Sequence, residues 1–348
     1  MTSDKLRWGL IGASDIAASR MIPAIRARGD DLVGVVSTDG ERAQRYAADH
    51  GLGLGTTELA ALLDRKDVDA VYISSTNEKH HSQAMAALAS GKHVLCEKPL
   101  ALTTDDANQI VAAADSAGLV LGVNHHLPGA GTHRMVQRLV RDGAIGTPLA
   151  ARVAHAGLLP ERLRGWRLDA APGGGVILDI TCHDASAVNA ILNLRPLSVI
   201  AAAASQGPWG STTYDAAMTV IRYDDGVLAQ THDAFTVGFA KTSLEVHGTN
   251  GSIIATDVMT QDPVGEVRLV DASGTRDVPV TDRRGLYQII LDAFGTAVAG
   301  EGRPTVTGTE GALALAVALA AQESATFGRA VDVGKAPVHP ASLRPSTI

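Results

Sequence analysis

The residues best suited to chemistry lie between Gly91 and Pro99, where the sequence reads GKHVLCEKP. An apolar run typical of a buried strand ends there in Glu97, Lys98 and Pro99. Charged side chains at the carboxyl end of a strand lie where open α/β sheets bind their ligands. Because proline fixes its own backbone and restricts the residue before it, the position of Lys98 is constrained. Lys98 is therefore a candidate for catalysis, and a strand end capped by solvated charges is the simpler alternative.

A second candidate group follows three glycines, in the segment VILDITCHDA that begins at Val176. If this segment is helical, Asp179 and His183 are four residues apart and share one face. A carboxylate beside an imidazole can orient the ring and raise its proton affinity, which suits a general acid or base near neutral pH. With Lys98 the pair would form a triad, in which Lys98 holds the substrate oxygen and His183 passes the proton. A nicotinamide would exchange the hydride, although an Asp-x-x-x-His pair is as often a surface or capping arrangement.

A dinucleotide-binding loop is predicted near the N-terminus, where Trp8 to Ala17 reads WGLIGASDIA. An apolar strand, a tight turn and a helix start follow one another within a βαβ pattern, which is the context that such loops require. Gly12 supplies the turn, Ala17 allows close packing, and Ser14 replaces the middle glycine with a hydroxyl that can bond a phosphate at the helix N-terminus. An ordinary strand–turn–helix is the alternative. The loop residues expected to contact the cofactor are Gly12, Ala13, Ser14, Ile16 and Ala17.

The end of the second strand discriminates between the two nicotinamide cofactors. NAD enzymes usually place an acid there, about 20 residues past the glycines, to bind the ribose diol. Here the strand ends in Ser37 and Thr38, and Arg42 follows one helical turn later. Hydroxyl groups and an arginine suit a 2′-phosphate, so the sequence favours NADP(H). Asp39 keeps NAD(H) possible, and Arg42 taken alone could be a solvated helix residue.

The first third of the chain must supply a parallel sheet to position these residues, because short apolar runs alternate there with helical patterns. This pattern predicts βαβ units over residues 1–124. The expected strands are Leu6–Ile11, Leu32–Val36, Ala70–Ile73, His93–Cys96 and Leu119–Val123. The expected helices are Ile16–Arg28, Glu41–His50, Thr57–Leu63, His81–Ala89 and Asp105–Ala117.

The pattern changes after residue 125, and residues 125–348 are expected to form a second domain with a largely antiparallel sheet and helices on one face. Hairpin signals of the Asn-Gly and Asp-Gly kind join several strand-like runs. Tyr287, Ile290, Leu291 and Phe294 fall at helical spacing and are interpreted as core. The expected strands are Leu149–His155, Val199–Ala204, Met218–Tyr223, Val227–Ala234, Leu244–Val246 and Ser252–Ala255. The tail from Lys335 is expected to pack loosely on the surface.

Composition narrows the classes of protein that the chain can belong to. Its 348 residues are enough for two domains, and 45% hydrophobic with 19% charged residues suits a globular protein. The net charge is −7 and no Lys/Arg-rich block occurs, so neither nucleic acid nor an anionic membrane is expected as a partner. Cys96 and Cys182 lie in apolar runs and are interpreted as buried thiols. The N-terminus lacks the layout of a signal peptide and no apolar stretch is long enough to span a membrane, so a cytoplasmic location is expected.

Together these motifs resemble the Gfo/Idh/MocA family of sugar and polyol oxidoreductases. The resemblance covers nearly the whole chain and rests on RWGLIGAS, STNEKHH, GKHVLCEKPL, GVNHHL, GWRL, GGGVILDITCHD and EVHGTNGS. It implies a Rossmann domain followed by an α/β domain whose large, mostly antiparallel open sheet commonly packs against a second subunit. A homo-oligomer is therefore expected. It also places Lys98, Asp179 and His183 in the active site, with Lys98 before a cis proline.

The resemblance extends the set of candidate site residues. No metal is expected, because the sequence contains no HExxH motif and no cysteine spacing typical of zinc sites. Asp15 and the short glycine approach DAAPGGG depart from the family pattern. The further residues expected to bind the cofactor are Ser75, Thr76, Asn77, His80, Glu97, Lys98 and Asn124. Those expected to bind the substrate are His126, His155, Trp166, Arg167, Asp179 and His183.

The function that the resemblance implies is an NADP(H)-dependent reductase of a cyclic sugar ketone, with His183 as the proton donor. Three alternatives stay open. The first is an NAD(P)-dependent dehydrogenase of an inositol, a glucoside or another polyol. The others are a cofactor-bound regulator without catalysis, and a glycosidase that uses tightly held NAD as a redox catalyst.

Overall fold

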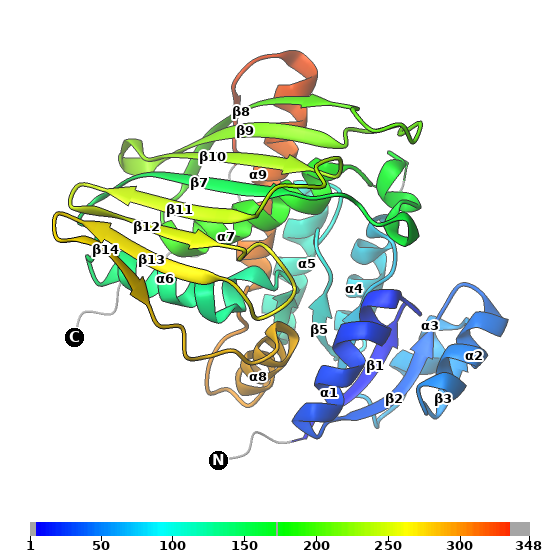
Figure 1. The fold of residues 1–348 in the computed structure, drawn as a ribbon. Coiled ribbons are helices and arrows are strands. Elements are labelled where there is room, and N and C mark those ends of the chain that lie inside the picture. Colours follow the sequence, from blue (N-terminus) through cyan, green and yellow to red (C-terminus); the bar gives the residue numbers. More distant parts are fainter. Residues whose placement is uncertain (1–4, 172, 335–348) are drawn as a thin grey trace. The chain divides into compact units, whose positions relative to one another are not determined.

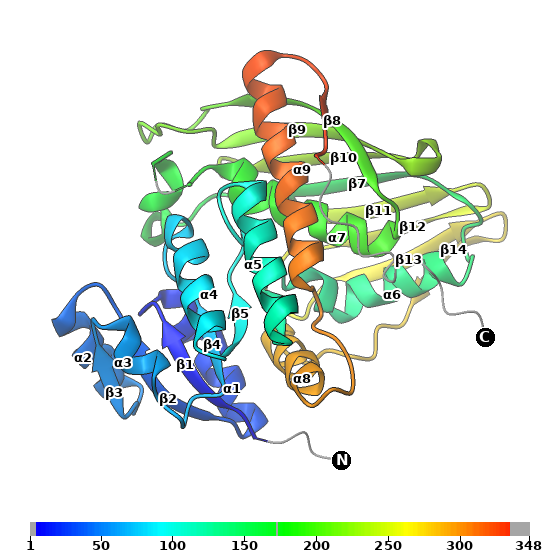
Figure 2. The same cartoon turned by 180° about the vertical axis from the view of Figure 1, so that it is seen from behind.

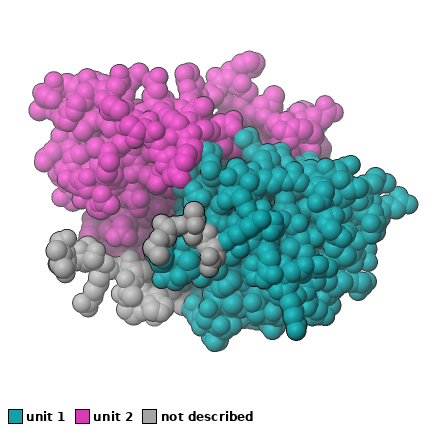
Figure 3. Space-filling model, turned by 90° about the horizontal axis from the view of Figure 1, so that it is seen from below, with its two compact units in different colours: residues 1–126, 285–311 teal, residues 127–284, 312–348 magenta. Residues whose placement is uncertain are grey.

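The computed structural model describes residues 5–171 and 173–334, so the tail from Lys335 that was expected to pack loosely lies outside the described residues. The chain divides into two compact units, coloured separately in Figure 3. The first comprises residues 1–126 and 285–311, and the second comprises residues 127–284 and 312–348. The first unit therefore includes a late segment, 285–311, that lies in the second of the predicted domains. The predicted domain boundary at residue 124 remains a prediction.

The first unit is built on a six-stranded sheet in the order β3-β2-β1-β4-β5-β6, with every neighbouring pair parallel. Helix α1 lies on one face, and α4 and α5 lie on the other (Figures 1 and 2). The predicted doubly wound parallel sheet is confirmed. The strands are β1 Arg7–Ile11, β2 Asp31–Val36, β3 Leu54–Thr56, β4 Ala70–Ile73, β5 His93–Cys96 and β6 Leu121–Val123. The helices are α1 Ile22–Arg28, α2 Gly40–Asp49, α3 Leu59–Leu63, α4 His80–Ala89, α5 Thr104–Ala117 and α8 Leu286–Val298.

The register of this sheet brings the ends of five strands to one edge. Ile11 pairs with Val36 and with Ile73, and Cys96 pairs with Ile73 and with Val123. The residues that follow these strands therefore share the carboxyl edge, which is the ligand-binding edge of an open α/β sheet. They are Gly12, Ser37, Ser74, Glu97 and Asn124.

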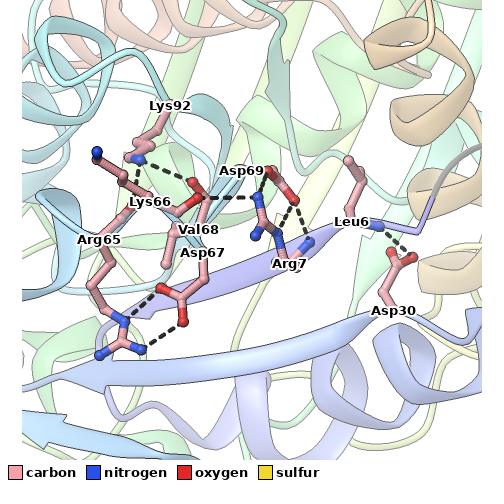
Figure 4. Close-up of polar contacts among 9 residues, drawn as sticks. All are labelled: Leu6, Arg7, Asp30, Arg65, Lys66, Asp67, Val68, Asp69 and Lys92. Atoms are coloured by element: carbon pink, nitrogen blue, oxygen red, sulfur yellow. Dashed lines mark hydrogen bonds and ion pairs between the residues drawn. The ribbon is translucent and has the colours of Figure 1, made fainter.

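The opposite edge of the sheet is held by polar contacts (Figure 4). Arg7 donates to both carboxylate oxygens of Asp69, at 2.6 and 2.9 Å, and this pairing lowers the pKa of Asp69. Lys92 donates to the backbone carbonyls of Arg65 and Val68, at 2.8 and 2.9 Å. These contacts join the starts of β1, β4 and β5. They therefore stabilise the sheet at the edge where its strands begin.

Strand β3 was missed because its three residues, with a glycine at the centre, carry almost no periodicity. Gly55 is needed there, since a Cβ would lie 2.8 Å from the backbone carbon of Ala43 on α2. The predicted core stripe on α8 is confirmed, because Tyr287, Ile290, Leu291 and Phe294 are all buried. Phe294 packs against Trp8, with ring centroids 5.3 Å apart, so this helix belongs to the core of the first unit.

The second unit is built on a nine-stranded sheet in the order β14-β13-β12-β11-β7-β10-β9-β8-β15. Only β7 and β10 pair in parallel among its described neighbours, so the predicted mostly antiparallel sheet is confirmed. Helices α6, α7 and α9 lie on one face (Figures 1 and 2). The strands are β7 Pro148–Ala156, β8 Pro196–Ala204, β9 Ala216–Tyr223, β10 Leu228–Ala234, β11 Ser243–Gly248, β12 Gly251–Thr256, β13 Glu266–Asp271, β14 Gly274–Val278 and β15 Val331–Asp332. The helices are α6 Gly131–Arg141, α7 Cys182–Leu192 and α9 Gly308–Phe327.

Two further expectations concern cysteine and membranes. Cys96 and Cys182 are both buried and form no disulfide, as predicted. Within the described ranges, no helix combines the length and apolar character needed to cross a membrane.

Candidate active site

The turn after β1 depends on Gly12, whose φ of 112° is a conformation that other residues rarely adopt. Its N–H donates to Val36 O at 2.8 Å, which ties the turn to β2. A Cβ at this position would lie 2.8 Å from the backbone of Ser74 and Ser75. The turn therefore packs closely against the end of β4, as the predicted dinucleotide loop requires.

Ser14 caps the helix that follows the loop. Its Oγ accepts the backbone N–H of Ala17 at 3.2 Å and lies 2.7 Å from the Oγ of Ser74. Ala17 has no exposed surface, which fits the close helix packing predicted for it. The first helical turn, η1 Ala17–Met21, is a π-helix that continues into α1. The prediction that the Ser14 hydroxyl bonds a phosphate stays a prediction.

Helix α2 braces the loop from the side of β2. Arg42 Nη2 donates to Ala13 O at 2.5 Å, and Tyr46 OH donates to Ser14 O at 3.0 Å. Burial and the nearby Asp15 carboxylate raise the pKa of the Tyr46 hydroxyl well above its usual value. Asp39 caps α2 by accepting the backbone N–H of Arg42 at 2.8 Å. Arg42 thus lies beside the predicted phosphate loop. Asp39, the acid that kept a ribose diol possible as its partner, already serves as the cap of α2.

The loops after β4 and β5 are joined by His80, which has no exposed surface. Its Nδ1 lies 2.8 Å from Pro99 O and its Nε2 lies 3.2 Å from Ser75 O. Burial lowers the pKa of His80, against the effect of its two carbonyl neighbours. Ser75, Thr76 and Asn77 follow β4 at this point, as expected for residues that line a cofactor site.

Glu97 is held at the end of β5 by two buried neighbours. Tyr72 donates its hydroxyl to Glu97 Oε1, and Asn124 Nδ2 donates to the same oxygen at 2.5 Å. Burial raises the pKa of the Glu97 carboxyl, against the effect of these hydrogen bonds. Lys98 follows with a partly buried side chain, and the Lys98–Pro99 peptide is cis, as the family resemblance implied.

The two histidines after β6 differ in their surroundings. His125 has no exposed surface, and burial together with the charge of Lys98 lowers its pKa to about 3. His126 is also buried and stacks on Tyr287, with ring centroids 5.9 Å apart. Both imidazoles belong to the first unit, and the substrate-binding role predicted for His126 remains a prediction.

Asp179 and His183 lie in the second unit on the predicted helical segment. The segment begins as a π-helix, η6 Ile177–Thr181, and continues as α7. Single π-turns often mark functional sites because they displace a few side chains from the regular helical pattern. Arg167 Nε donates to Asp179 Oδ2 at 3.0 Å, which gives the buried Asp179 carboxylate a cationic partner.

The segment around Trp166 is fixed to the start of that helix. Arg167 lies over the Trp166 ring, 4.6 Å from its centroid. Gly175 N donates to Arg167 O at 2.8 Å, and a Cβ on Gly174 would collide with Trp166 O. The three glycines thus allow Trp166, Arg167 and Asp179 to lie together, whereas Trp166 is half-buried and not part of the core.

His155 on β7 is bound to a residue that the sequence did not single out. Its Nδ1 lies 2.7 Å from Oδ1 of the fully buried Asp184. Asp184 directly follows His183, the candidate proton donor. This adjacency was the signal in the sequence that could have marked Asp184 as a functional residue. Tyr72 and Tyr46 were also missed, although Tyr46 lies one helical turn after Arg42.

The structure therefore collects the predicted residues into two sets, one in each unit. The carboxyl edge of the parallel sheet carries the cofactor set, with Lys98. The second unit carries Arg167, Asp179 and His183, together with His155 bound to Asp184. Nowhere in the described parts of the chain are three His, Cys, Asp or Glu side chains grouped so that they could hold a metal ion.

A parallel sheet with this loop and edge defines an NAD(P)-binding oxidoreductase, and comparison with known proteins identifies the family. Residues 6–125 match the oxidoreductase family with an NAD-binding Rossmann fold, and residues 133–254 match the GFO/IDH/MocA C-terminal domain. The chain is 49% identical over 328 residues to the 1,5-anhydro-D-fructose reductase of Ensifer adhaerens, covering 94% of this chain and 98% of that relative. The chain belongs to the Gfo/Idh/MocA family of oxidoreductases.

Other relatives act on other sugars. The chain is 28% identical to the D-xylose 1-dehydrogenase (NADP(+)) 2 of Haloferax volcanii, over 94% of this chain and all of that relative. The aldose-aldose oxidoreductase of Caulobacter crescentus shares the fold with a TM-score of 0.85 at 24% identity, over 94% of this chain and 100% of its own. A levoglucosan dehydrogenase in complex with NADH has a TM-score of 0.84 at 22% identity, over 95% of this chain and 100% of its own. The fold thus serves several sugar substrates, as the range of these relatives requires.

Proposed function

We propose that this protein reduces 1,5-anhydro-D-fructose, a cyclic sugar ketone, to 1,5-anhydro-D-mannitol with NADPH. The observation that carries the proposal is 49% identity to a 1,5-anhydro-D-fructose reductase along nearly the full length of both chains. The relative with the D-xylose dehydrogenase activity is much more distant, at 28%. The candidate catalytic residues Lys98, Asp179 and His183 are all present, which favours an enzyme over a non-catalytic regulator.

The residues at the carboxyl edge fit a dinucleotide. Gly12 has no Cβ and so lets the turn pack directly against the backbone of Ser74 and Ser75, and a helix begins just after this turn. Asn124 Oδ1 is buried and lacks a hydrogen-bond partner among the described residues, so it can accept from a bound group. When bound there, NADPH supplies the hydride for the reduction.

The preference for NADPH is proposed from the end of β2. Arg42 is exposed at the first turn of α2 and reaches back to the phosphate loop through Ala13 O. Asp39 uses one carboxylate oxygen to cap that helix. A guanidinium near hydroxyl groups suits a 2′-phosphate, for which arginine is the preferred partner.

The chemistry proposed for the protein's own residues divides among four side chains. Lys98 donates a hydrogen bond to the substrate's carbonyl oxygen and stabilises the negative charge that develops there. His183 gives this oxygen its proton, so the ketone gains one hydride and one proton and becomes an alcohol. Arg167 neutralises Asp179, and Asp179 helps to keep His183 ready to donate a proton.

Association with a second copy of the chain is part of this proposal. The face of the nine-stranded sheet opposite α6 and α7 exposes large apolar side chains on neighbouring strands, and such contiguous exposure is typical of an interface. The strands β7, β10, β9 and β8 are neighbours in the sheet, so this face forms a continuous surface. It is long enough to pack against the same face of a second copy of the chain. Its exposed apolar members are Ile200, Met218, Val220 and Leu228. Val220→Glu should convert an oligomer to monomers in light scattering, and a wild type that is already monomeric would contradict this part.

The cytoplasm is the proposed location, because buried thiols without a disulfide suit a reducing compartment. The activity is tested by incubating the purified protein with 1,5-anhydro-D-fructose and NADPH and identifying the product by NMR. Formation of 1,5-anhydro-D-mannitol supports the proposal. Turnover only of an inositol, a glucoside or another polyol, with NAD⁺ or NADP⁺, would replace it with the dehydrogenase alternative.

A further inference from the structure

Two of the aspartates without exposed surface in the second unit are Asp184 on α7 and Asp233 on β10. His155 on β7 is the register partner of Asp233, and its Nδ1 lies 2.7 Å from Asp184 Oδ1. We refer to Asp184, Asp233 and His155 as the acid cluster. Buried carboxylates are costly unless they are paired or hydrogen-bonded, so the contacts of this cluster need to be accounted for.

One side of the cluster is well supplied with hydrogen-bond donors. Asp233 Oδ2 accepts from Thr181 Oγ1 at 2.5 Å and from Thr231 Oγ1 at 2.8 Å. The other carboxylate oxygens of the two aspartates differ in this respect. Among the described residues, no donor reaches Asp184 Oδ2 or Asp233 Oδ1, and both atoms are buried. The mutual influence on their pKa values nevertheless places these two carboxyl groups within hydrogen-bonding reach of each other. Two carboxyl groups can form a hydrogen bond only if one of them carries a proton.

The charges around the cluster lead to the same conclusion. The titratable groups that face it are His155 from β7 and, next to His155, His133 from α6. Burial and the proximity of His155 lower the pKa of His133 to about 3, so His133 supplies no positive charge near pH 7. Even a protonated His155 supplies a single positive charge, so two ionised carboxylates would leave one negative charge uncompensated. Burial raises the pKa of Asp184 to about 7, and burial with the neighbouring Asp184 raises the pKa of Asp233 well above its usual value.

We propose that Asp184 and Asp233 share one proton, and that the pair acts as positioning residues for His155 and for the helical turn that carries Asp179 and His183. Asp233 contacts this helical segment twice, through Thr181 and through Asp184. These two contacts lie on either side of His183 in the sequence and fix the rotation of the helix against β10. The proton-sharing stands on the structure alone, whereas its effect on turnover rests on the proposed function.

Infrared spectroscopy of the full-length protein tests the shared proton directly. At pH 8, above the pKa of about 7 of Asp184, the wild type should show the carbonyl stretch of the one protonated carboxyl group of the pair. Asp233→Asn should lose this band, because the remaining Asp184 is then ionised beside His155. The matched control is Asp215→Asn, which removes another fully buried carboxyl whose two oxygens accept from Gln206 N and Gly207 N. This control should retain the band. A band that is unchanged in Asp233→Asn would overturn the proposal.

The pH dependence of thermal unfolding gives an independent test. Because the folded protein retains a proton that the unfolded chain has released, the wild type loses stability as pH rises from about 4 towards the raised folded pKa. Asp233→Asn lacks this loss, so its Tm relative to wild type should increase between about pH 5 and about pH 8. A constant Tm difference over this interval would contradict the shared proton. Asp215→Asn should be less stable than wild type throughout.

Turnover tests the positioning role. Asparagine at position 233 can still donate to Asp184 and accept from the two threonines, so Asp233→Asn should keep kcat within about threefold of wild type. Leucine at position 233 can make none of these hydrogen bonds. Asp233→Leu should therefore misplace the catalytic turn and lower kcat by about 10- to 100-fold. Equal kcat values for the two variants would overturn this role. If the wild type does not reduce the sugar ketone, the infrared and unfolding results still decide whether the proton is shared.

Discussion

Replacing Arg42 with alanine separates two tasks of one side chain. Nη2 donates to Ala13 O at 2.5 Å, which holds the phosphate loop whichever dinucleotide is bound. The guanidinium is also proposed to pair with the 2′-phosphate, which only NADP(H) carries. Loss of the first contact should weaken both cofactors, and loss of the second should weaken NADPH alone.

The magnitudes of the two losses differ enough to be measured. A hydrogen bond of this kind contributes a net ~1 kcal/mol, so the Kd of NADH should rise about fivefold in Arg42→Ala. A hydrogen bond to a charged group contributes about 1.5–3 kcal/mol, which adds a further factor of about 10 to 150 for NADPH. The preference for NADPH over NADH should therefore fall by about 10- to 150-fold.

Isothermal titration of both cofactors against wild type and variant measures this preference. The matched control is Arg45→Ala, on the same helix, where the exposed guanidinium pairs with Glu41 at 3.2 Å and reaches no loop carbonyl. Both Kd values should be unchanged in the control. Equal weakening of NADPH and NADH in Arg42→Ala would show that Arg42 only supports the loop, and would refute the assignment of NADP specificity to it.

Three further predictions concern catalysis and stability. His183→Ala should lower kcat by roughly 10²- to 10⁴-fold with cofactor affinity retained, as measured by steady-state kinetics and titration, and near-normal turnover would remove the proton-donor role. Gly12→Ala should lower Tm and abolish dinucleotide binding, because the new Cβ would meet the Ser74 backbone at 2.8 Å; normal NADPH affinity would contradict this. Trp8→Phe should cost about 0.5–1.5 kcal/mol in chemical denaturation, because it removes the indole N–H that donates to Asp30 Oδ2 at 2.9 Å while Arg28 Nη1 still donates to the same oxygen at 2.6 Å. A loss below ~0.5 kcal/mol would show that this hydrogen bond is not needed.

Much of the fold could be predicted because local patterns and tertiary structure agree. The alternation of apolar runs with helical stretches gave β4 Ala70–Ile73 and β5 His93–Cys96 with the observed bounds. The Asn-Gly hairpin signal matched the start of β12 at Gly251. The short β3 could not be found in this way, because its place is fixed by pairing with β2 and not by its own composition.

The candidate site was predictable where it lies in short motifs. Gly12 and Glu97 to Pro99 follow predicted strands directly, so their shared edge follows from the parallel topology. Asp233 could not be found, because it is one acid in an ordinary strand and is brought beside His155 only through the pairing of β10 with β7. The partner of Asp179 was also unexpected, since the contact with Arg167 depends on how the glycine turn folds back. Contacts between distant segments set these features, and a single sequence carries no local signal for them.

The central claim is that this member of the Gfo/Idh/MocA family is an NADPH-dependent reductase of 1,5-anhydro-D-fructose. The most direct test follows cofactor absorbance while the purified protein meets this sugar, with NADPH and NADH in parallel reactions. The account predicts rapid consumption of NADPH and much slower consumption of NADH. Consumption of neither cofactor, or a preference for NADH, would contradict it.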